Sequence, residues 1–193
     1  MKKVWFDSDG RALCAQRGDM NAIGPEGSIL MDVAGDRDIN RIALIDGEVV
    51  DRQLMTIVAD RTIIRADGED AAHLSGIAQG AALLIDGQMF PAQHDLLALT
   101  SAQPCYRIIE PALGHYGPMI QIQFQTAADI AVAVRKARDA RLAACDWTQA
   151  LDAPLSERVR AAWQAYRQTL RDLPAAQPAA TIETVIWPSL PAN

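Results

Sequence analysis

Four Asp-Gly pairs occur in the first half of the chain, at positions 9–10, 46–47, 67–68 and 86–87. An Asp-Gly pair between two apolar runs favours a tight hairpin turn, because both residues tolerate positive φ. The pairs at 9–10 and 46–47 each stand between such runs. Their recurrence predicts that this part of the chain folds into antiparallel strand pairs.

Residues 61–126 continue the pattern, with short apolar runs separated by Gly and Pro residues. Residues 119–125 alternate apolar and polar side chains, as a half-buried strand does. Short strands that recur every 8–12 residues or so are typical of a small sandwich or barrel. We therefore expect a small β-sandwich here, preceded by a separate β region.

The hydrophobic period changes in the last third of the chain, where apolar side chains recur at helical spacing. Thr126 can cap a first helix, with Asp129 as its acidic partner three residues later. A break over residues 146–154 follows, and Ser156 can cap a second helix. Pro174 is expected to end that helix. The short linker predicts an antiparallel helical hairpin.

The predicted fold class is mainly β with a C-terminal α-helical hairpin, a modular α+β arrangement. The expected domains are an N-terminal β region over residues 1–60, a small β-sandwich over 61–126, and the helical hairpin over 127–193. The last part includes an extended, Pro-rich tail with one β-like run at residues 181–186.

The net charge of −6 argues against a nucleic-acid partner, because phosphate-binding surfaces need clustered Lys and Arg. Residues 127–173 are the exception, with eight basic and six acidic residues. They could dock on an acidic partner or simply form solvated helix faces. No run of about 20 apolar residues occurs, so no membrane span is expected. We expect a soluble cytoplasmic protein, with later incorporation into a particle left open.

No motif of a catalytic or metal site is recognisable, so we expect no enzymatic activity, no cofactor and no metal. We favour surface or turn positions for the three histidines. Their convergence on a metal ion is the alternative. The acidic residues near two turns suggest calcium, but they lack the later ligands of an EF-hand loop. The cysteines are expected to be small buried hydrophobes. These residues are His73, His94, His115, Asp7, Asp9, Asp36, Asp38, Cys14, Cys105 and Cys145.

Four aromatic residues in the last third of the chain are the candidate partner-binding residues: Trp147, Trp163, Tyr166 and Trp187. Trp163 and Tyr166 share one face of the second predicted helix. The favoured interpretation is that the four form the hairpin's own core and lock the tail against it. The alternative is a docking surface, because a two-helix hairpin buries little apolar area by itself.

A long motif runs through residues 138–174, including RLAACDWTQ from Arg141 and AAWQAYRQTLRDLP from Ala161. Together with VIWP at residues 185–188, it resembles the phage tail assembly chaperone-like domain at the C-terminus of tail and tail-fibre accessory proteins. The resemblance implies a non-enzymatic chaperone or accessory protein of a tailed bacteriophage or prophage. It would act in the host cytoplasm by binding a phage tail or tail-fibre protein.

Shorter stretches carry further resemblances. The opening hairpin and residues 45–50 look like the N-terminal part of tail-fibre accessory proteins, and residues 66–87 resemble small immunoglobulin-like modules of tail proteins. They imply an immunoglobulin-like β-sandwich. They also leave an alternative open, in which the chain is a structural or carbohydrate-binding component of the tail itself. A homo-oligomer is left open, and nothing points to a glycan hydrolase.

Overall fold

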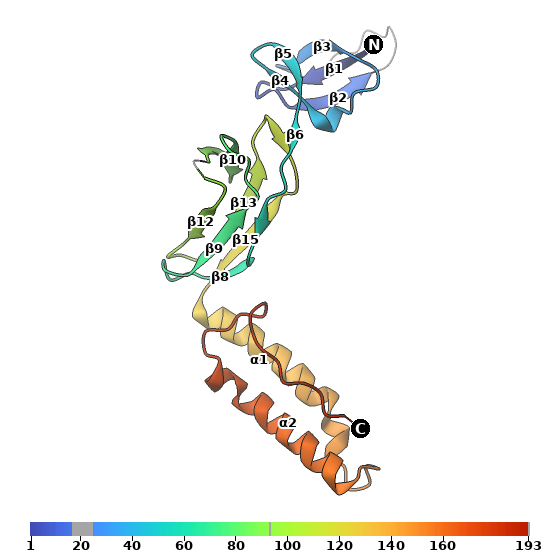
Figure 1. Cartoon of the computed structure of the whole chain (residues 1–193), viewed down its shortest axis with the longest axis vertical. Helices are drawn as coiled ribbons and strands as arrows, with labels where there is room; N and C mark the ends of the chain where they lie inside the picture. Colours follow the sequence, from blue (N-terminus) through green and yellow to red (C-terminus); the bar gives the residue numbers. More distant parts are fainter. Residues whose placement is uncertain (17–24, 93, 193) are drawn as a thin grey trace. The chain divides into compact units, whose positions relative to one another are not determined.

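The computed structural model describes residues 1–16, 25–92 and 94–192, which form two compact units (Figure 1). Unit 1 comprises Met1–Asp60, His73–Leu99 and Arg107–Ile122. Unit 2 comprises Arg61–Ala72, Thr100–Tyr106 and Gln123–Asn193. Among the described residues, no helix has both the length and the apolar character needed to cross a membrane.

The N-terminal part of unit 1 is a three-stranded antiparallel sheet. Strand β1 (Lys2–Phe6) lies between β2 (Ala12–Gln16) and β3 (Ile29–Val33). Alternate side chains of β1 point inward, so Val4 and Phe6 are fully buried. They form a core cluster with Val33, Ile42 and Leu44.

The predicted hairpins at 9–10 and 46–47 are both present, but their turns differ. The turn between β4 (Ile42–Ile45) and β5 (Glu48–Asp51) has positive φ at both Asp46 and Gly47. The turn between β1 and β2 has positive φ at Gly10 alone. Gly10 also approaches the neighbouring backbone, because the Leu44 N–H donates to the Gly10 carbonyl at 2.9 Å. A short 3-10 helix, η1 (Ile39–Arg41), leads into β4.

The remaining strands belong to a five-stranded sheet, ordered β11-β10-β13-β15-β8, and to smaller groups. Strand β10 lies between β11 and β13, β9 lies between β7 and β12, and β6 pairs in parallel with β14. Leu74, Leu83 and Ile109 are fully buried. The strand bounds are β6 (Gln53–Leu54), β7 (Val58–Ala59), β9 (Ala71–Ser75), β10 (Ala82–Ile85), β11 (Gln88–Pro91), β12 (Leu97–Thr100), β13 (Cys105–Pro111) and β14 (His115–Tyr116).

Unit 2 combines a parallel strand pair with the two helices. Strand β8 (Ile63–Arg65) pairs with β15 (Ile120–Gln125). Helix α1 (Ala127–Ala144) and helix α2 (Glu157–Ala176) run antiparallel side by side, joined through the 3-10 helix η2 (Asp146–Gln149) (Figure 1).

Both predicted helix caps are confirmed. The Thr126 hydroxyl accepts from the Asp129 N–H at 3.1 Å, and the Ser156 hydroxyl accepts from the Val159 N–H at 3.3 Å. The mainly β fold with a C-terminal helical hairpin is thus confirmed. The division into three domains and the immunoglobulin-like form of the second stay predictions.

Three local expectations are wrong. Helix α2 passes through Pro174 and ends at Ala176, because a proline in the last turn forfeits only one helical hydrogen bond. Residues 181–186 form no strand: 182–184 are a turn, and the others are irregular. Cys14 is exposed, whereas Cys145 is buried as expected. The sequence also gave no sign of β3 or of the two-residue strands β6, β7 and β14.

The two hairpin glycines provide a matched pair for a stability test. A Cβ at Gly10 would lie 2.1 Å from the Leu44 carbonyl oxygen, whereas a Cβ at Gly47 would meet nothing within 4 Å. Gly47→Ala should cost about 1–2 kcal/mol from the left-handed backbone alone. Gly10→Ala should cost clearly more, since a backbone atom must also move. Urea unfolding of both variants checks this, and equal losses would contradict it.

Candidate protein-docking site

An aromatic cluster fills the space between α1 and α2. Trp163 and Tyr166 of α2 are buried with Leu170 and Cys145. Their rings meet edge to face, with centroids 5.6 Å apart. Trp147 of η2 packs edge-on against Trp163 at 6.1 Å. These contacts supply the apolar burial that a two-helix hairpin needs in order to stay closed.

Arg167 is a buried charge in this cluster that the sequence analysis missed. Its guanidinium donates to the Leu142 carbonyl at 2.8 Å and to the Cys145 Sγ at 3.0 Å, and it forms an ion pair with Asp146 at 2.8 Å. Burial lowers the pKa of Arg167, but the bonds to Asp146 and Cys145 outweigh it and raise the pKa. The signal was its position four residues after Trp163, on the same helix face.

Two buried donors in the cluster have no acceptor among the described residues: Trp163 Nε1 and Arg167 Nε. Both residues are more than nine-tenths buried. A buried donor without an acceptor costs about 1–3 kcal/mol. The cluster therefore packs well but leaves hydrogen-bonding capacity unused.

Residues 177–192, here called the strap, run back along the two helices as an irregular segment (Figure 1). Val185 packs against Val134 and Leu173. The Trp187 ring covers the Arg141 guanidinium at 3.7 Å and contacts the aromatic cluster. The predicted locking of the Trp187 segment onto the helical pair is thus present.

The strap also closes one edge of strand β8. The Glu183 carboxylate accepts from the N–H groups of Thr62 and Ile63 at 2.9 and 3.0 Å, and from the Thr62 hydroxyl. The next outward N–H along the strand, that of Arg65, donates to Asp70 at 3.0 Å. Carboxylates therefore occupy donors that would otherwise be open to another strand.

The pKa of Glu183 reflects this contact. Burial raises the pKa of the carboxyl, but the hydrogen bonds from Thr62 and Ile63 and the charge of Arg61 outweigh it and lower the pKa. Asp70 behaves similarly: burial raises its pKa, whereas bonds from Arg65 and Arg61 lower it. Both carboxylates are held in the ionised form that accepts these donors.

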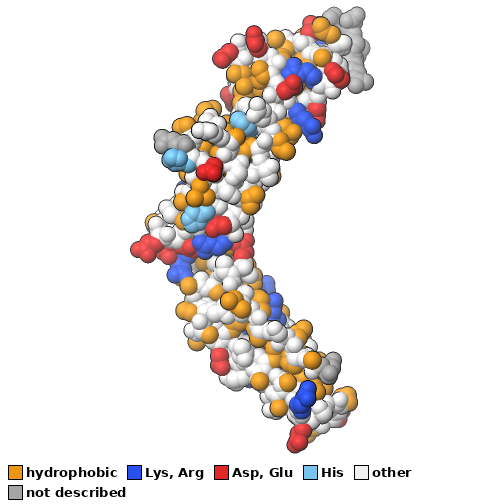
Figure 2. All heavy atoms as spheres, viewed as in Figure 1, with side chains coloured by type: hydrophobic (Ala, Val, Ile, Leu, Met, Phe, Trp, Pro, Cys, Tyr) orange, Lys and Arg blue, Asp and Glu red, His pale blue; other side chains and the backbone are white. Residues whose placement is uncertain are grey.

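Apolar side chains remain exposed at the turn between the helices. Trp147 is 50% exposed and Leu151 is 99% exposed. A shallow cavity of about 310 Å³ lies there, lined by Trp147, Pro154, Leu155, Ser156 and Val159. Figure 2 shows further apolar side chains on the visible face of the helical pair. We call Trp147, Leu151 and the cavity the hairpin tip.

The structure thus separates the four predicted partner-binding residues. Trp163 and Tyr166 are buried in the hairpin core, and Trp187 is half-buried on it. Trp147 alone among them presents a large part of its ring to solvent. Their role in partner binding stays a prediction, which the geometry favours most for Trp147.

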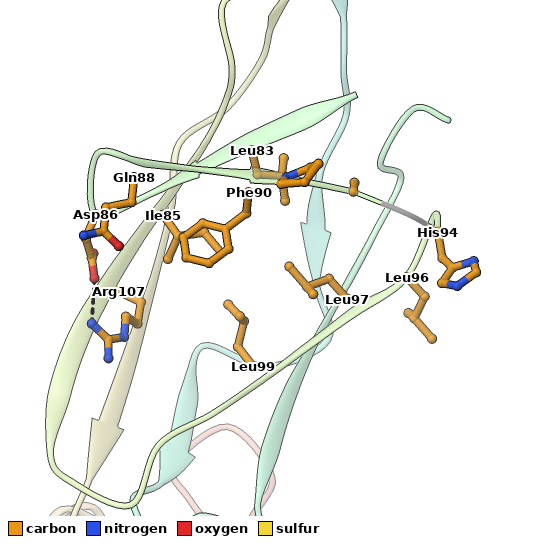
Figure 3. Close-up of a pocket in the computed structure, with 12 residues that line it drawn as sticks. Leu83, Ile85, Asp86, Gln88, Phe90, His94, Leu96, Leu97, Leu99 and Arg107 are labelled. Atoms are coloured by element: carbon orange, nitrogen blue, oxygen red, sulfur yellow. Dashed lines mark hydrogen bonds and ion pairs between the residues drawn. The ribbon is translucent and has the colours of Figure 1, made fainter. Parts of the chain in front are cut away.

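Unit 1 holds a larger cavity of about 660 Å³ (Figure 3). Leu83, Ile85 and Phe90 of the β10–β11 hairpin face Leu97 and Leu99 across it. Polar groups border it: Arg107 pairs with Asp86 at 2.7 Å, and Gln88 and His94 also line the space.

The histidines lie in separate surroundings. His73 contacts the Asp60 carboxylate at 3.1 Å, His94 lines the unit 1 cavity, and the His115 carbonyl accepts from Arg52. Across the described part of the chain, no group of three or more potential ligands could hold a metal ion.

Comparison with known proteins adds one finding. Residues 131–192 match the family described as "Phage tail assembly chaperone protein". The match covers α1 from its second turn, η2, α2 and the strap, which confirms the resemblance seen in the sequence and supports a role in phage tail assembly. No curated protein and no solved structure shows significant similarity to the chain.

The Glu183 contact predicts a pH-dependent stability. Because the folded pKa lies below the unfolded value of about 4.3, the stabilisation is complete above that pH and disappears as the pH falls through the folded pKa. Glu183→Gln should lower the melting temperature at neutral pH, and its curve should converge with that of the wild type in acid. Glu48→Gln, at an exposed site in β5, is the control. A difference that is constant with pH would contradict the prediction.

Proposed function

We propose that the chain acts in phage tail assembly by docking on a tail or tail-fibre protein through the hairpin tip. The premise is the family match of residues 131–192. The observation that carries the proposal is the exposure of Trp147 and Leu151 side by side with a cavity at the turn of the helical pair. Large exposed apolar side chains beside a shallow cavity are typical of interaction sites.

The hairpin tip has the composition of a binding hot spot. A tryptophan on a rigid support can anchor a partner with little loss of conformational freedom, because its base is already packed against Trp163. Leu151 contributes almost nothing to the hairpin's own core, since nearly all of its surface is exposed. Its hydrophobic contribution is therefore available to a partner.

In this role the protein shields or positions its partner by surface complementarity, without bond-making chemistry. We place its action in the host cytoplasm, before the tail is complete. Purified particles that lack the chain would support a chaperone, whereas its presence in particles would favour a component of the virion.

A second candidate function is glycan binding by a structural component of the tail. The unit 1 cavity favours it, because the half-exposed Phe90 ring can stack on a sugar face and polar side chains border the space. Its mostly aliphatic walls suit an apolar side chain of a protein equally well, so we rank this function second.

Substitutions at the hairpin tip test the first proposal. Leu151→Asp or Trp147→Ala in the tagged full chain should reduce the tail protein recovered from phage-producing cells by about tenfold or more, as for a hot-spot loss of about 2 kcal/mol. Val132→Asp is the matched control, since Val132 is also an exposed aliphatic residue of unit 2. Recovery of no tail or fibre component by the wild type, or equal recovery by all variants, would count against the proposal.

Phe90→Ala tests the second candidate. If the cavity binds glycans, the wild type should retain surface glycans of the host on an array, and Phe90→Ala should lose most of that binding. Met89→Ala, on the neighbouring exposed position of β11, should keep it. Absence of wild-type binding would exclude the glycans tested.

A further inference from the structure

The strap is held by side chains that alternate along it. Glu183 accepts from the edge of β8, Val185 enters the cluster of Val134 and Leu173, and Trp187 covers Arg141. Between them, Ile186 faces outward and is 77% exposed. Residues 182–184 form a turn, and residues 185–187 follow it without regular secondary structure. The part of α1, α2 and β8 that the side chains of Glu183, Val185 and Trp187 cover is here called the groove.

Backbone pairing contributes little to this attachment. In the described part of the strap, the backbone N–H groups of Thr184 and Val185 donate only to Thr181 nearby. The Ile186 backbone N–H donates to the Gln177 side-chain oxygen, and the Gln177 side-chain amide donates to the Ile186 carbonyl. Gln177 also belongs to the strap. No backbone bond from these residues to α1, α2 or β8 is present there. The strap is therefore held mainly by side chains: those of Glu183, Val185 and Trp187, with Ala180 packed beside Val185.

The aromatic cluster on which the strap packs contains two buried donors without an acceptor among the described residues. Trp187 packs on the cluster that contains Trp163, whose indole N–H has no acceptor among the described residues. The Nε–H of Arg167, one turn later in α2, also has no acceptor among the described residues. An occupant that brings acceptors to these donors would fit the groove better than the strap does.

We propose that the strap is an exchangeable occupant, and that a segment of the partner protein takes its place. The segment would carry a carboxylate, an aliphatic side chain two residues later, and an aromatic ring two residues after that. This inference rests on the proposed function, since it names the partner's binding element. The strap has a high effective concentration because it is covalently attached to the groove, so the partner segment must bind more strongly to replace it. Acceptors for the Trp163 and Arg167 donors would provide such additional binding.

A labelled synthetic peptide of residues 177–192 is the probe, with the full chain as its receptor. The receptor variant Glu183→Gln/Trp187→Ala weakens the built-in strap and leaves the groove intact. It should bind the peptide at least about tenfold tighter than the wild type, because less of the groove is occupied. A peptide with the same two changes is the control and should not bind. Glu183→Gln alone replaces the double variant if the latter fails to fold.

Fluorescence anisotropy measures binding, and hydrogen exchange locates it on α1, α2 and β8. Equal or absent binding by the wild type and a folded variant would overturn the proposal. The full chain without peptide is also tested for dimers. A dimer fraction that increases with protein concentration would contradict the proposal that a partner protein fills the groove, because the strap of a second copy would then fill it. A failure here with a positive hairpin-tip result would leave the proposed function standing.

Discussion

The burial of one apolar stripe between α1 and α2 is the constraint on which unit 2 depends. Two helices joined by a short turn cannot bury enough surface by themselves. Here the missing apolar burial comes from two sources. Tyr166 and Leu170 of α2 pack with Trp163, and Trp187 of the strap packs against the same cluster. The strap is thus a third layer of the helical pair, which makes its position relevant to any partner that approaches.

Local chemistry explains why the helices and hairpins were predictable. Thr126 and Ser156 act through hydrogen bonds to residues three positions away, so the caps can be recognised in sequence. The Asp-Gly turns are equally local. The difference between Gly10 and Gly47 was not predictable, because the approach of Gly10 to Leu44 is a contact between distant segments.

The candidate site was only half predictable for the same reason. Helical periodicity placed Trp163 and Tyr166 on one face, and the structure confirms that placement. The exposure of Trp147 depends on the direction in which η2 turns. The role of Glu183 depends on its contact with Ile63 of β8, which is 120 residues earlier in the sequence. Nothing in the neighbouring residues of Glu183 encodes its partners. The family motif identified the region, and only the folded chain shows which side chains are still available.

The carboxylates along β8 have a consequence for what that edge can recognise. A β-ladder needs donors and acceptors in alternation on both strands. Glu183 and Asp70 remove the donors of Ile63 and Arg65, so the edge is left with acceptors only. An arriving strand could satisfy its own N–H groups there but would find no hydrogen for its carbonyls. Indiscriminate stacking of chains is thereby disfavoured, and a molecule that is to bind the Ile63 N–H must bring an anion that displaces Glu183.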